Sequence, residues 1–349
     1  MAKNIIFLIK KLKYLFLRFK MKSRLFIYFA ISALFSCSHE EVETKLVEAE
    51  AVKIASKSDL GKNIYFQGID DIEKIDGSFY LLDSDINKIF CTDEDLNYKF
   101  SFMESGGAEY EATGSVRIAC FNEVIYVADV SAGKIMLFDK NGKFLKNHRS
   151  DHWGIGDFFV FDAGIATFND NENYKEKPFM IWNEVKGTKS FFGKKADKRL
   201  KNADRHLIRL SKGKMMSVYA ENRPIIEIYS DEGEQLSEKD LGDLALFNPV
   251  LRYYEKDIEK NPSTALVLIP DIYYTSGKLY LLITYMNSKE EWFSDVVIEC
   301  EVNIDRNKIQ ATKIIKLDKK QWYESLFIDA ESETLFVGGE AIIEKYSLP

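Results

Sequence analysis

The chain has 349 residues and a formal net charge of −7. Residues 1–36 hold eight of the 48 basic residues and no acidic residue, so in residues 37–349 the other 40 basic residues face 55 acidic ones, a net charge of −15. This acidity excludes general binding to nucleic acid through clustered Lys and Arg, and attachment to an anionic membrane surface by charge alone. With 46% hydrophobic and 13% aromatic residues, the composition is that of a folded chain.

The N-terminal segment is typical of a secretory signal. Lys22 and Arg24 are followed by an almost purely apolar stretch over residues 25–35, which is too short to span a bilayer comfortably. It ends in Leu34-Phe35-Ser36-Cys37, which resembles the lipobox of bacterial lipoproteins. The resemblance implies that residues 1–36 are a signal peptide cut before Cys37, and that Cys37 carries a covalent lipid anchor.

Two alternatives remain open for this segment. It could be an uncleaved membrane helix, and Met21 could be the true start, with residues 1–20 an upstream extension. Residues 37–45 form an acidic tether, and the acids just after Cys37 resemble the surface-export signal of Bacteroidetes lipoproteins. That resemblance implies an outer-membrane protein that faces outward; the alternative is an ordinary solvated tether.

Cysteine usage agrees with export. With Cys37 lipidated, Cys91, Cys120 and Cys300 remain, far apart and within apolar runs. We expect three buried thiols that act as small hydrophobic side chains, while one disulfide plus one free thiol is the alternative.

The body of the chain contains an internal repeat. Residues 79–93 and 125–139 align without gaps at a spacing of 46, and each reads as an apolar strand, a short polar turn and a second strand. The second copy ends in the tight turn Asp139–Lys143, where Asn-Gly favours a hairpin because both residues tolerate positive φ. Looser copies give six inner strands that begin near residues 79, 125, 164, 214, 278 and 334.

Six units of about fifty residues predict an all-β fold, a six-bladed β-propeller of four-stranded blades over residues 46–349. We expect the N-terminal strand, near Leu46-Val47 or Val52-Lys53-Ile54, to close the ring beside the last blade, which removes open sheet edges. Residues 252–259 could form two helical turns that end at Asn261-Pro262. Two β-sandwiches are the structural alternative.

The chain resembles the six-bladed β-propeller lipoproteins of Bacteroidetes, which are akin to NHL-repeat and TolB-like propellers. The strands at 125–129 and 135–138, the turn that follows them and the loop Gly106–Tyr110 carry the resemblance. These motifs specify a fold and no chemistry.

Candidate metal-binding residues are few. Asp83 and Asp129 occupy equivalent strand ends, where they could line a central channel and bind a cation, although capping of backbone N–H groups is favoured. His148, Asp151 and His152 suggest a weak zinc motif in an expected loop over residues 147–154. The basic run 194–201 is interpreted as a solvated loop, and no nucleophile elbow, phosphate loop, zincin or kinase motif is present.

Ligand-binding candidates are aromatic or polar residues in or near the expected loops. Exposed aromatics there could stack on sugar rings or anchor a partner protein, although aromatics also fill the space between propeller blades. The candidates are Trp153, His152, Tyr253, Tyr254 and Trp292.

The sequence therefore predicts a lipid-anchored propeller at the outer membrane and cell surface that binds a ligand without catalysis. The expected partners are the membrane, through the lipid, and a glycan, a peptide or an outer-membrane protein. No cofactor beyond the lipid on Cys37 and no nucleic acid are expected. The alternative is a metal-dependent hydrolase or lyase with its site at the central channel.

Overall fold

Apolar strands joined by short polar turns make up most of the chain that the structure describes. The computed structural model describes the residues 46–61, 64–149, 153–162, 164–169, 176–183, 186–194, 205–211, 213–261, 265–318 and 321–349, with only the backbone of 153–156. Residues 46–349 form one compact unit. The predictions for residues 1–36, for Cys37 and the tether 37–45, and for Asp151 and His152 concern residues outside this set. No helix of the described residues is long and apolar enough to cross a membrane.

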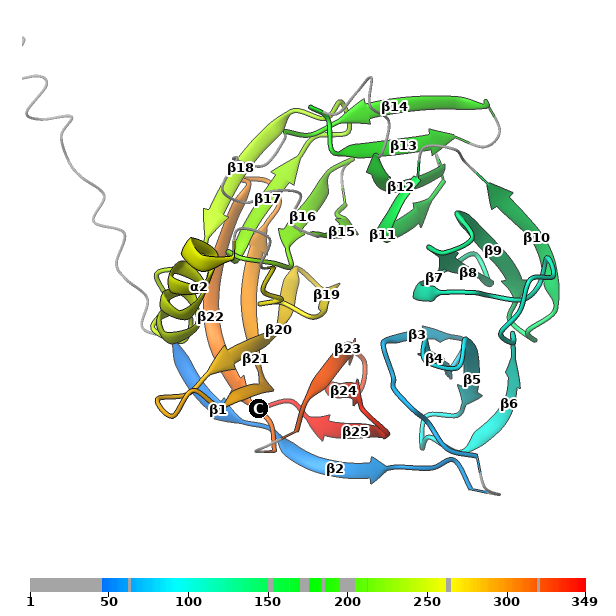
Figure 1. Cartoon of the computed structure of the whole chain (residues 1–349), viewed down its shortest axis with the longest axis horizontal. Coiled ribbons are helices and arrows are strands. Elements are labelled where there is room, and N and C mark those ends of the chain that lie inside the picture. The colour runs from blue at the N-terminus through cyan, green and yellow to red at the C-terminus, as the bar shows by residue number, and fades with distance from the viewer. Residues whose placement is uncertain are drawn as a thin grey trace, which may run out of the picture. The chain divides into compact units, whose positions relative to one another are not determined.

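Six sheets stand around a central axis, which confirms the prediction of a six-bladed β-propeller with four-stranded blades and excludes two sandwiches (Figure 1). Blades 1 to 3 comprise β3 (Asp71–Ile75), β4 (Ser78–Asp83), β5 (Lys88–Thr92), β6 (Tyr98–Phe102), β7 (Ser115–Phe121), β8 (Val124–Asp129), β9 (Lys134–Asp139), β10 (Phe144–Arg149), β11 (Trp153–Phe161), β12 (Gly164–Asn169), β13 (Phe179–Asn183) and β14 (Thr188–Phe192). Blades 4 to 6 comprise β15 (Arg205–Arg209), β16 (Met215–Tyr219), β17 (Ile225–Tyr229), β18 (Gln235–Asp240), β19 (Ile272–Thr275), β20 (Lys278–Met286), β21 (Trp292–Asn303), β22 (Lys308–Lys316), β23 (Tyr323–Asp329), β24 (Thr334–Gly339) and β25 (Ile342–Ser347), with β2 (Val52–Lys57) as the fourth strand of blade 6.

The strands predicted as innermost are the second strands of their blades. β4, β8, β12, β16, β20 and β24 begin within one residue of the predicted positions, but a further strand precedes each of them on the axis side. The prediction was wrong because the axial strands carry charged residues, such as Asp71 and Arg117, that interrupt the apolar pattern. Their neighbours are almost entirely buried, as in β4 and β16, and give the stronger signal.

The predicted turn between β9 and β10 is present. The carboxylate of Asp139 accepts hydrogen bonds from the N–H groups of Asn141 and Lys143, both at 2.9 Å. Gly142 has a φ of +77°, and a Cβ there would lie 2.6 Å from the ring of Phe102 in blade 1. Glycine is therefore required both by the backbone conformation and by the neighbouring ring.

Both N-terminal segments that were considered for ring closure form strands at the edges of the last two blades. β1 (Val47–Glu50) lies parallel to β22 as a fifth strand of blade 5, and β2 pairs with β25 in blade 6. The buried carboxylate of Glu344 in β25 accepts hydrogen bonds from Tyr323 and Tyr346 of its own blade, from Ser56 in β2 at 2.9 Å, and from Lys53 in β2 at 2.7 Å.

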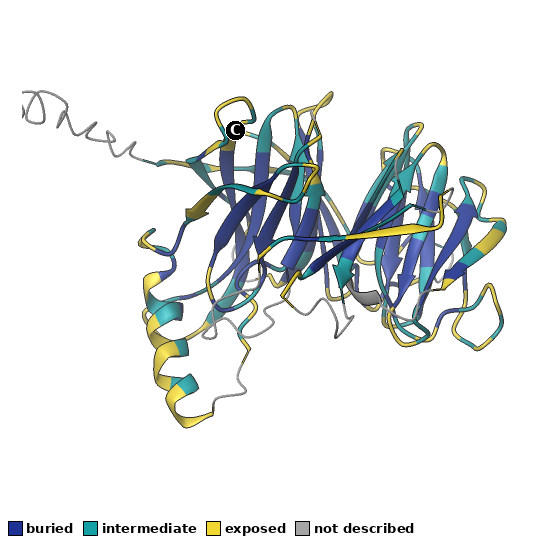
Figure 2. Ribbon diagram, turned by 90° about the horizontal axis from the view of Figure 1, so that it is seen from above, coloured by how far each residue is buried: buried dark blue, intermediate teal, exposed yellow. Residues whose placement is uncertain are grey.

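Aromatic side chains fill the gaps between blades. Phe79 of blade 1 lies against Phe327 and Phe336 of blade 6, with ring centroids 5.4 and 4.4 Å apart. Phe179 of blade 3 contacts Tyr229 of blade 4 at 5.7 Å. Figure 2 shows the buried residues concentrated in the middle of the blades, with exposed residues at their ends. Contacts of this kind hold the ring together at a distance from the axis.

Helix α2 (Asn248–Lys260) lies in the connection between blades 4 and 5 and begins earlier than predicted. Pro249 stands in its first turn, where a missing N–H costs no hydrogen bond, and the helix ends at Asn261 as expected. Val250 is its buried residue. The helix projects from one face of the propeller with an exposed outer side (Figure 2).

The three cysteines of the body are free thiols, as expected. Cys91 and Cys300 are buried, and Cys120 is half-buried. Burial raises the pKa of the Cys300 thiol to about 12, which makes it an unreactive member of the core.

Candidate functional site

One equivalent position in each blade lies beside the central axis. The six residues there come from the axial strands or, in blade 5, from the residue just before the strand: Asp71, Arg117, Asp157, His206, Asp271 and Ser325. The strand registers show the equivalence, because Asp71 lies opposite Leu82 and Arg117 opposite Ala128, the matching residues of the 46-residue repeat. Blades 1, 3 and 5 thus carry aspartates, and blades 2, 4 and 6 carry Arg, His and Ser.

Each aspartate joins its own blade to the next one. Oδ2 of Asp71 accepts the backbone N–H of Ile118 at 2.7 Å. Asp157 accepts that of Leu207 at 3.1 Å, and Asp271 accepts that of Leu326 at 2.7 Å. The acceptors satisfy buried N–H groups that face the channel and have no further strand to pair with.

Arg117 lies among all three aspartates. Its Nη1 is 2.8 Å from Oδ1 of Asp271 and 3.6 Å from Oδ1 of Asp71, and its Nε is 3.6 Å from Oδ1 of Asp157. Its Nη2 is 2.9 Å from Nδ1 of His206. A guanidinium that is 12% exposed thus compensates two buried carboxylates, of Asp71 and Asp271, and the half-buried carboxylate of Asp157, each from a different blade.

Both ring nitrogens of His206 have partners. Nδ1 lies 3.2 Å from Oδ2 of Asp157 as well as near Arg117, and Nε2 lies 2.8 Å from the carbonyl oxygen of Ile269. Because a carbonyl can only accept, Nε2 carries a proton. In blade 6, Ser325 donates to the carbonyl oxygen of Ile69 at 2.6 Å, which joins the last blade to the first.

Burial sets the protonation behaviour of the channel. It raises the pKa of Asp71 to about 7 although Arg117 opposes the shift, and it also raises the pKa of Asp271. The pKa of Glu73, two residues further along β3, lies well above its usual value because of burial and the nearby Asp71. Burial would also raise the pKa of Asp157, but Arg117 and the hydrogen bond with His206 outweigh it, and that pKa is lowered.

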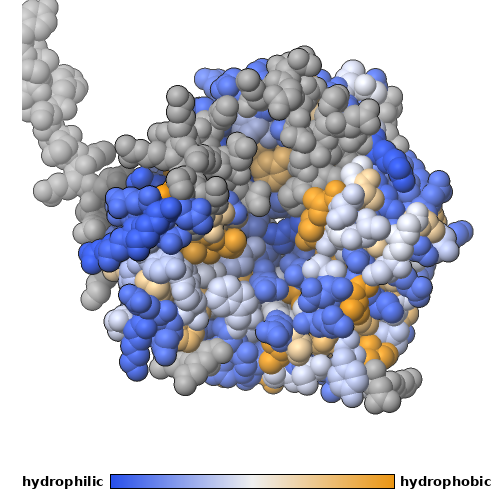
Figure 3. Space-filling model, in the orientation of Figure 1, coloured by the Kyte–Doolittle hydropathy of each residue, from blue (hydrophilic) through white to orange (hydrophobic). Residues whose placement is uncertain are grey.

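The three axial aspartates and Arg117 line a channel cavity of about 220 Å³, which extends past Glu73, Cys120 and Tyr273. Figure 3 shows the hollow at the centre of the ring, with hydrophilic surface in its depth. Within the described part of the chain, no group of three or more His, Cys, Asp or Glu residues is arranged to hold a metal ion. The guanidinium of Arg117 is the cation on which the three carboxylates converge. The metal-dependent hydrolase or lyase stays a prediction.

Asp83 and Asp129 cap backbone N–H groups, which is the role that the sequence favoured for them. Both are buried, and they accept the N–H groups of Gln67 at 2.7 Å and Thr113 at 3.0 Å. They end second strands, one strand away from the channel.

The expected loop over residues 147–154 is in part strand, because residues 147–149 end β10 and Trp153 begins β11. His148 is buried in β10, and its ring packs edge to face on Trp182 at 4.9 Å. Asp151 and His152 lie outside the described residues, so the weak zinc motif stays a prediction.

Three of the predicted ligand-binding residues belong to one region: two are neighbours in α2, and the third contacts one of them. Tyr253 and Tyr254 belong to α2, and Trp292 begins β21. The rings of Tyr253 and Trp292 meet edge to face, with centroids 5.4 Å apart, and Tyr253 is 41% exposed. Tyr254 is half-buried, and burial raises the pKa of its hydroxyl. A binding role for these residues stays a prediction.

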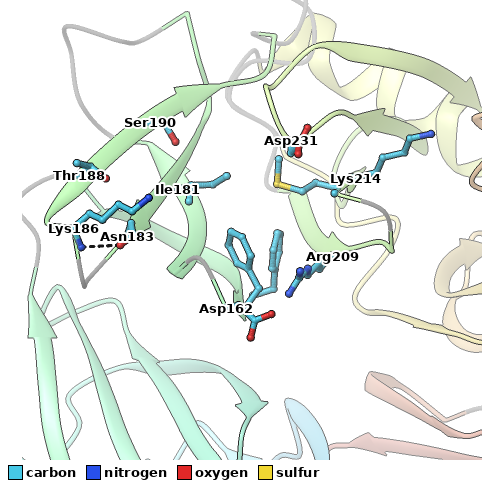
Figure 4. A pocket seen from close by; sticks show the side chains of 13 residues that line it. Asp162, Ile181, Asn183, Lys186, Thr188, Ser190, Arg209, Lys214 and Asp231 are labelled. Carbon is cyan, nitrogen blue, oxygen red and sulfur yellow. Dashed lines mark hydrogen bonds between the residues drawn. The ribbon is translucent and has the colours of Figure 1, made fainter.

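A second cavity of about 430 Å³ lies between blades 3 and 4 (Figure 4). Its apolar lining includes Phe159, Phe161, Ile181 and Met215, and charged side chains, among them Arg209, stand around it. Sequence reasoning did not find this cavity, nor the six axial residues. One sequence pattern could have indicated the six axial residues. Each is a polar residue about ten positions before the middle of the apolar second strand of its blade.

The fold and its axial ring define the class, a six-bladed β-propeller. No protein-family model and no curated protein matches the chain. A member of the DUF4221 family from Bacteroides vulgatus is similar in structure, with a TM-score of 0.53, 11% identity and coverage of 85% of this chain and 97% of that one.

Two further solved structures are similar. The WD40 repeats of RRP9 align with a TM-score of 0.51 and 8% identity, covering 81% of this chain and 95% of that one. A Bacteroides fragilis protein that carries the provisional name of an exported protein aligns with a TM-score of 0.48 and 12% identity, covering 78% of each chain. At these identities the two similarities with TM-scores above 0.5 support the fold and nothing beyond it.

Replacing Arg117 tests the charge balance of the axis. We expect Arg117→Met to lower the free energy of unfolding by about 3–5 kcal/mol, because it leaves buried carboxylates without their cation. Adding Asp271→Asn to that variant should recover part of the loss. Urea unfolding measures both, and Arg223→Met, which removes an exposed pair with Asp240, should cost at most about 1 kcal/mol. An Arg117→Met protein as stable as the Arg223→Met protein would contradict the assignment.

Asp71 predicts a pH dependence of stability. An unfolded aspartate titrates near pH 4, so between about pH 4 and pH 7 the folded chain holds a proton at Asp71 that the unfolded chain has lost. This contribution to stability therefore falls as pH rises through that range. Asp71→Asn, which keeps an acceptor for Ile118, should remove on the order of 2 kcal/mol of the decrease measured by urea unfolding from pH 5 to pH 8. The exposed Asp95→Asn is the control, and an unchanged slope in Asp71→Asn argues against the raised pKa.

Proposed function

We propose that this chain is a lipid-anchored propeller at the outer membrane and cell surface, and that it binds a glycan, a peptide or an outer-membrane protein without catalysis. The observation that carries the proposal is the edge-to-face pair beside α2, in which the exposed Tyr253 lies against the half-buried Trp292. Tyr and Trp offer a large, rigid contact area at a small cost in conformational entropy, which is why such residues dominate binding surfaces.

The chemistry of the channel supports binding over catalysis. All six oxygens of the axial aspartates have partners: Oδ1 of Asp71 accepts the N–H of Ile72, Oδ1 of Asp157 accepts that of Phe158, and the other four contact Arg117 or the next blade. His206 likewise uses both nitrogens. A general acid or base needs one such atom directed toward a substrate.

The position of the aromatic pair supports a role in recognition. The helix that carries Tyr253 stands out from one face, and Trp292 begins a strand in the adjacent blade. Connections at the ends of propeller blades can change without disturbing the strands, so a rigid scaffold commonly presents its binding residues there.

The anchor rests on the resemblance of residues 34–37 to a lipobox and on the short distance along the chain to the propeller. β1 begins at Val47, ten residues after Cys37, so the acidic tether leads directly into the ring. Lipid chains attached at Cys37 contribute about 0.8 kcal/mol per buried CH₂ group, and several chains together give a stable anchor.

Binding through the aromatic pair is tested with Tyr253→Ala, Trp292→Ala and the double variant. We expect each single change to weaken capture of the partner by about 30-fold or more, and the double variant to lose less than the product because the rings contact each other. The assay is affinity capture of the full chain with outer-membrane extracts, glycan arrays and peptide libraries. Tyr65→Ala removes another exposed tyrosine and serves as the control. If both single variants and the double variant bind as well as the parent and the Tyr65→Ala control, the pair has no role in binding.

Anchoring has its own test. Cys37→Ser should move the protein from the outer-membrane pellet to the soluble fraction, because the thiol that accepts lipid is gone, whereas Cys91→Ser should stay in the pellet. Fractionation followed by immunoblotting distinguishes the two. A Cys37→Ser protein that still pellets with the outer membrane would show that lipid on this residue is not the anchor.

A further inference from the structure

The cavity between blades 3 and 4 opens at the end of the blades opposite to α2. Its lining includes residues of the turns that join first to second and third to fourth strands, at Asp162, Lys186, Gly213 and Asp231. Helix α2 lies in a connection from a fourth strand to the next first strand, and successive antiparallel strands place these two kinds of connection at opposite ends. The cavity is therefore separate from the Tyr253–Trp292 pair.

Blade 3 carries smaller side chains than blade 1 at two equivalent positions beside this gap, and one of them is Ala166 where blade 1 has Tyr80. Phe102 of blade 1 and Phe192 of blade 3 are equivalent, since each packs on the turn glycine of the following blade, Gly142 or Gly233. Two residues earlier, blade 1 has Phe100, whose ring lies 6.2 Å from that of Phe102, and blade 3 has Ser190. The serine leaves a space that an aromatic ring fills in the first blade.

The exposed lining carries both charges and hydroxyl groups. Arg209 lies over the ring of Phe161, with its guanidinium carbon 4.9 Å from the centroid, and no carboxylate of the described residues forms an ion pair with it. Thr188 and Ser190 present hydroxyls from the same face of β14, opposite Asn183 and Ile181 of β13. Figure 4 shows these strands and Arg209 on different sides of the cavity.

Three lining residues are cationic: Arg209 lies over the ring of Phe161, Lys186 is an exposed turn residue, and Lys214 is held elsewhere. The ammonium of Lys214 is held by the carbonyl oxygen of Ile304 and by Oδ1 of Asn307, both at 2.7 Å. Asp162 and Asp231 are exposed acceptors at the rim. A volume of about 430 Å³ is within the usual range for small-molecule sites.

We propose that this cavity binds a carboxylate-bearing saccharide of one or two sugar units. The guanidinium of Arg209, oriented by Phe161, binds the carboxylate through paired N–H groups. Phe159 and Phe161 contact the C–H face of the ring, while Thr188, Ser190, Asn183 and Asp162 exchange hydrogen bonds with its hydroxyls. A zwitterionic amino acid could also pair with Arg209 and with the aspartates at the rim. It has no sugar hydroxyls, however, so most of the polar side chains named above would have no hydrogen-bond partner.

Calorimetric titration of the full chain in detergent micelles with digalacturonic acid tests the proposal. One molecule should bind per chain, and the dimethyl ester, which keeps every hydroxyl, should bind about tenfold more weakly or worse. Arg209→Met should weaken the acid by a similar factor and leave the ester unchanged. Ser190→Phe, which copies blade 1, should abolish binding at an unchanged or higher melting temperature, and Lys189→Ser, on the other face of β14, should bind as the parent does.

Several outcomes would overturn the proposal: no heat of binding with digalacturonic acid, equal binding of the ester, an unaffected Arg209→Met protein, or binding of phenylalanine in preference to the sugar acid. If Ser190→Phe does not fold, the comparison of acid with ester in the parent and in Arg209→Met decides the matter. The result is independent of the proposed function, because a chain that fails to bind here can still capture a partner through Tyr253 and Trp292, and the reverse holds as well.

Discussion

A closed circuit of polar contacts around the axis is the constraint on which the ring depends. Asp71 joins blade 1 to 2, Arg117 with Asp157 joins 2 to 3, and Asp157 joins 3 to 4. His206 reaches the carbonyl of Ile269 at the entry to blade 5, Asp271 joins 5 to 6, and Ser325 returns to blade 1. Because three of these links come from carboxylates that are buried or half-buried, the circuit depends on the guanidinium of Arg117, which compensates them.

The circuit also determines where recognition can take place. The groups at the axis are committed to one another, so the surfaces left for ligands are the connections at the blade ends and any gap between blades that is incompletely filled. The described residues include an example of each, the aromatic pair beside α2 and the cavity beside Ser190. They lie at opposite ends of the blades, so the two proposed sites do not overlap.

The blade count, the turn at Asp139 and the closing strand could be read from the sequence, because each produces a local signal: an apolar run, an Asn-Gly pair, or a spare strand near an end. The axial strands could not, since Asp71, Arg117 and His206 replace the apolar residues that mark a strand, and their role exists only when blades distant in sequence meet. The cavity was equally hidden. Beside it, blade 3 has a serine where blade 1 has a phenylalanine and an alanine where blade 1 has a tyrosine, and that comparison requires the register of blades 1 and 3. The Tyr253–Trp292 contact could be predicted only in part. Both residues were candidates for ligand binding, but no local pattern in the sequence indicates that their rings touch.

The way in which the N-terminal strands are shared between two blades has a mechanical consequence. A force transmitted through the tether reaches β1 first, and β1 is held by four residue pairs with β22 and by the ion pair between Glu48 and Lys316. A pull along β1 loads those bonds together in shear, and β2 stays paired with β25 until they yield. If the proposed anchor holds the chain at Cys37, a pull on it would have to break the pairing of β1 with β22 before it reached the pairing of β2 with β25 that closes the ring.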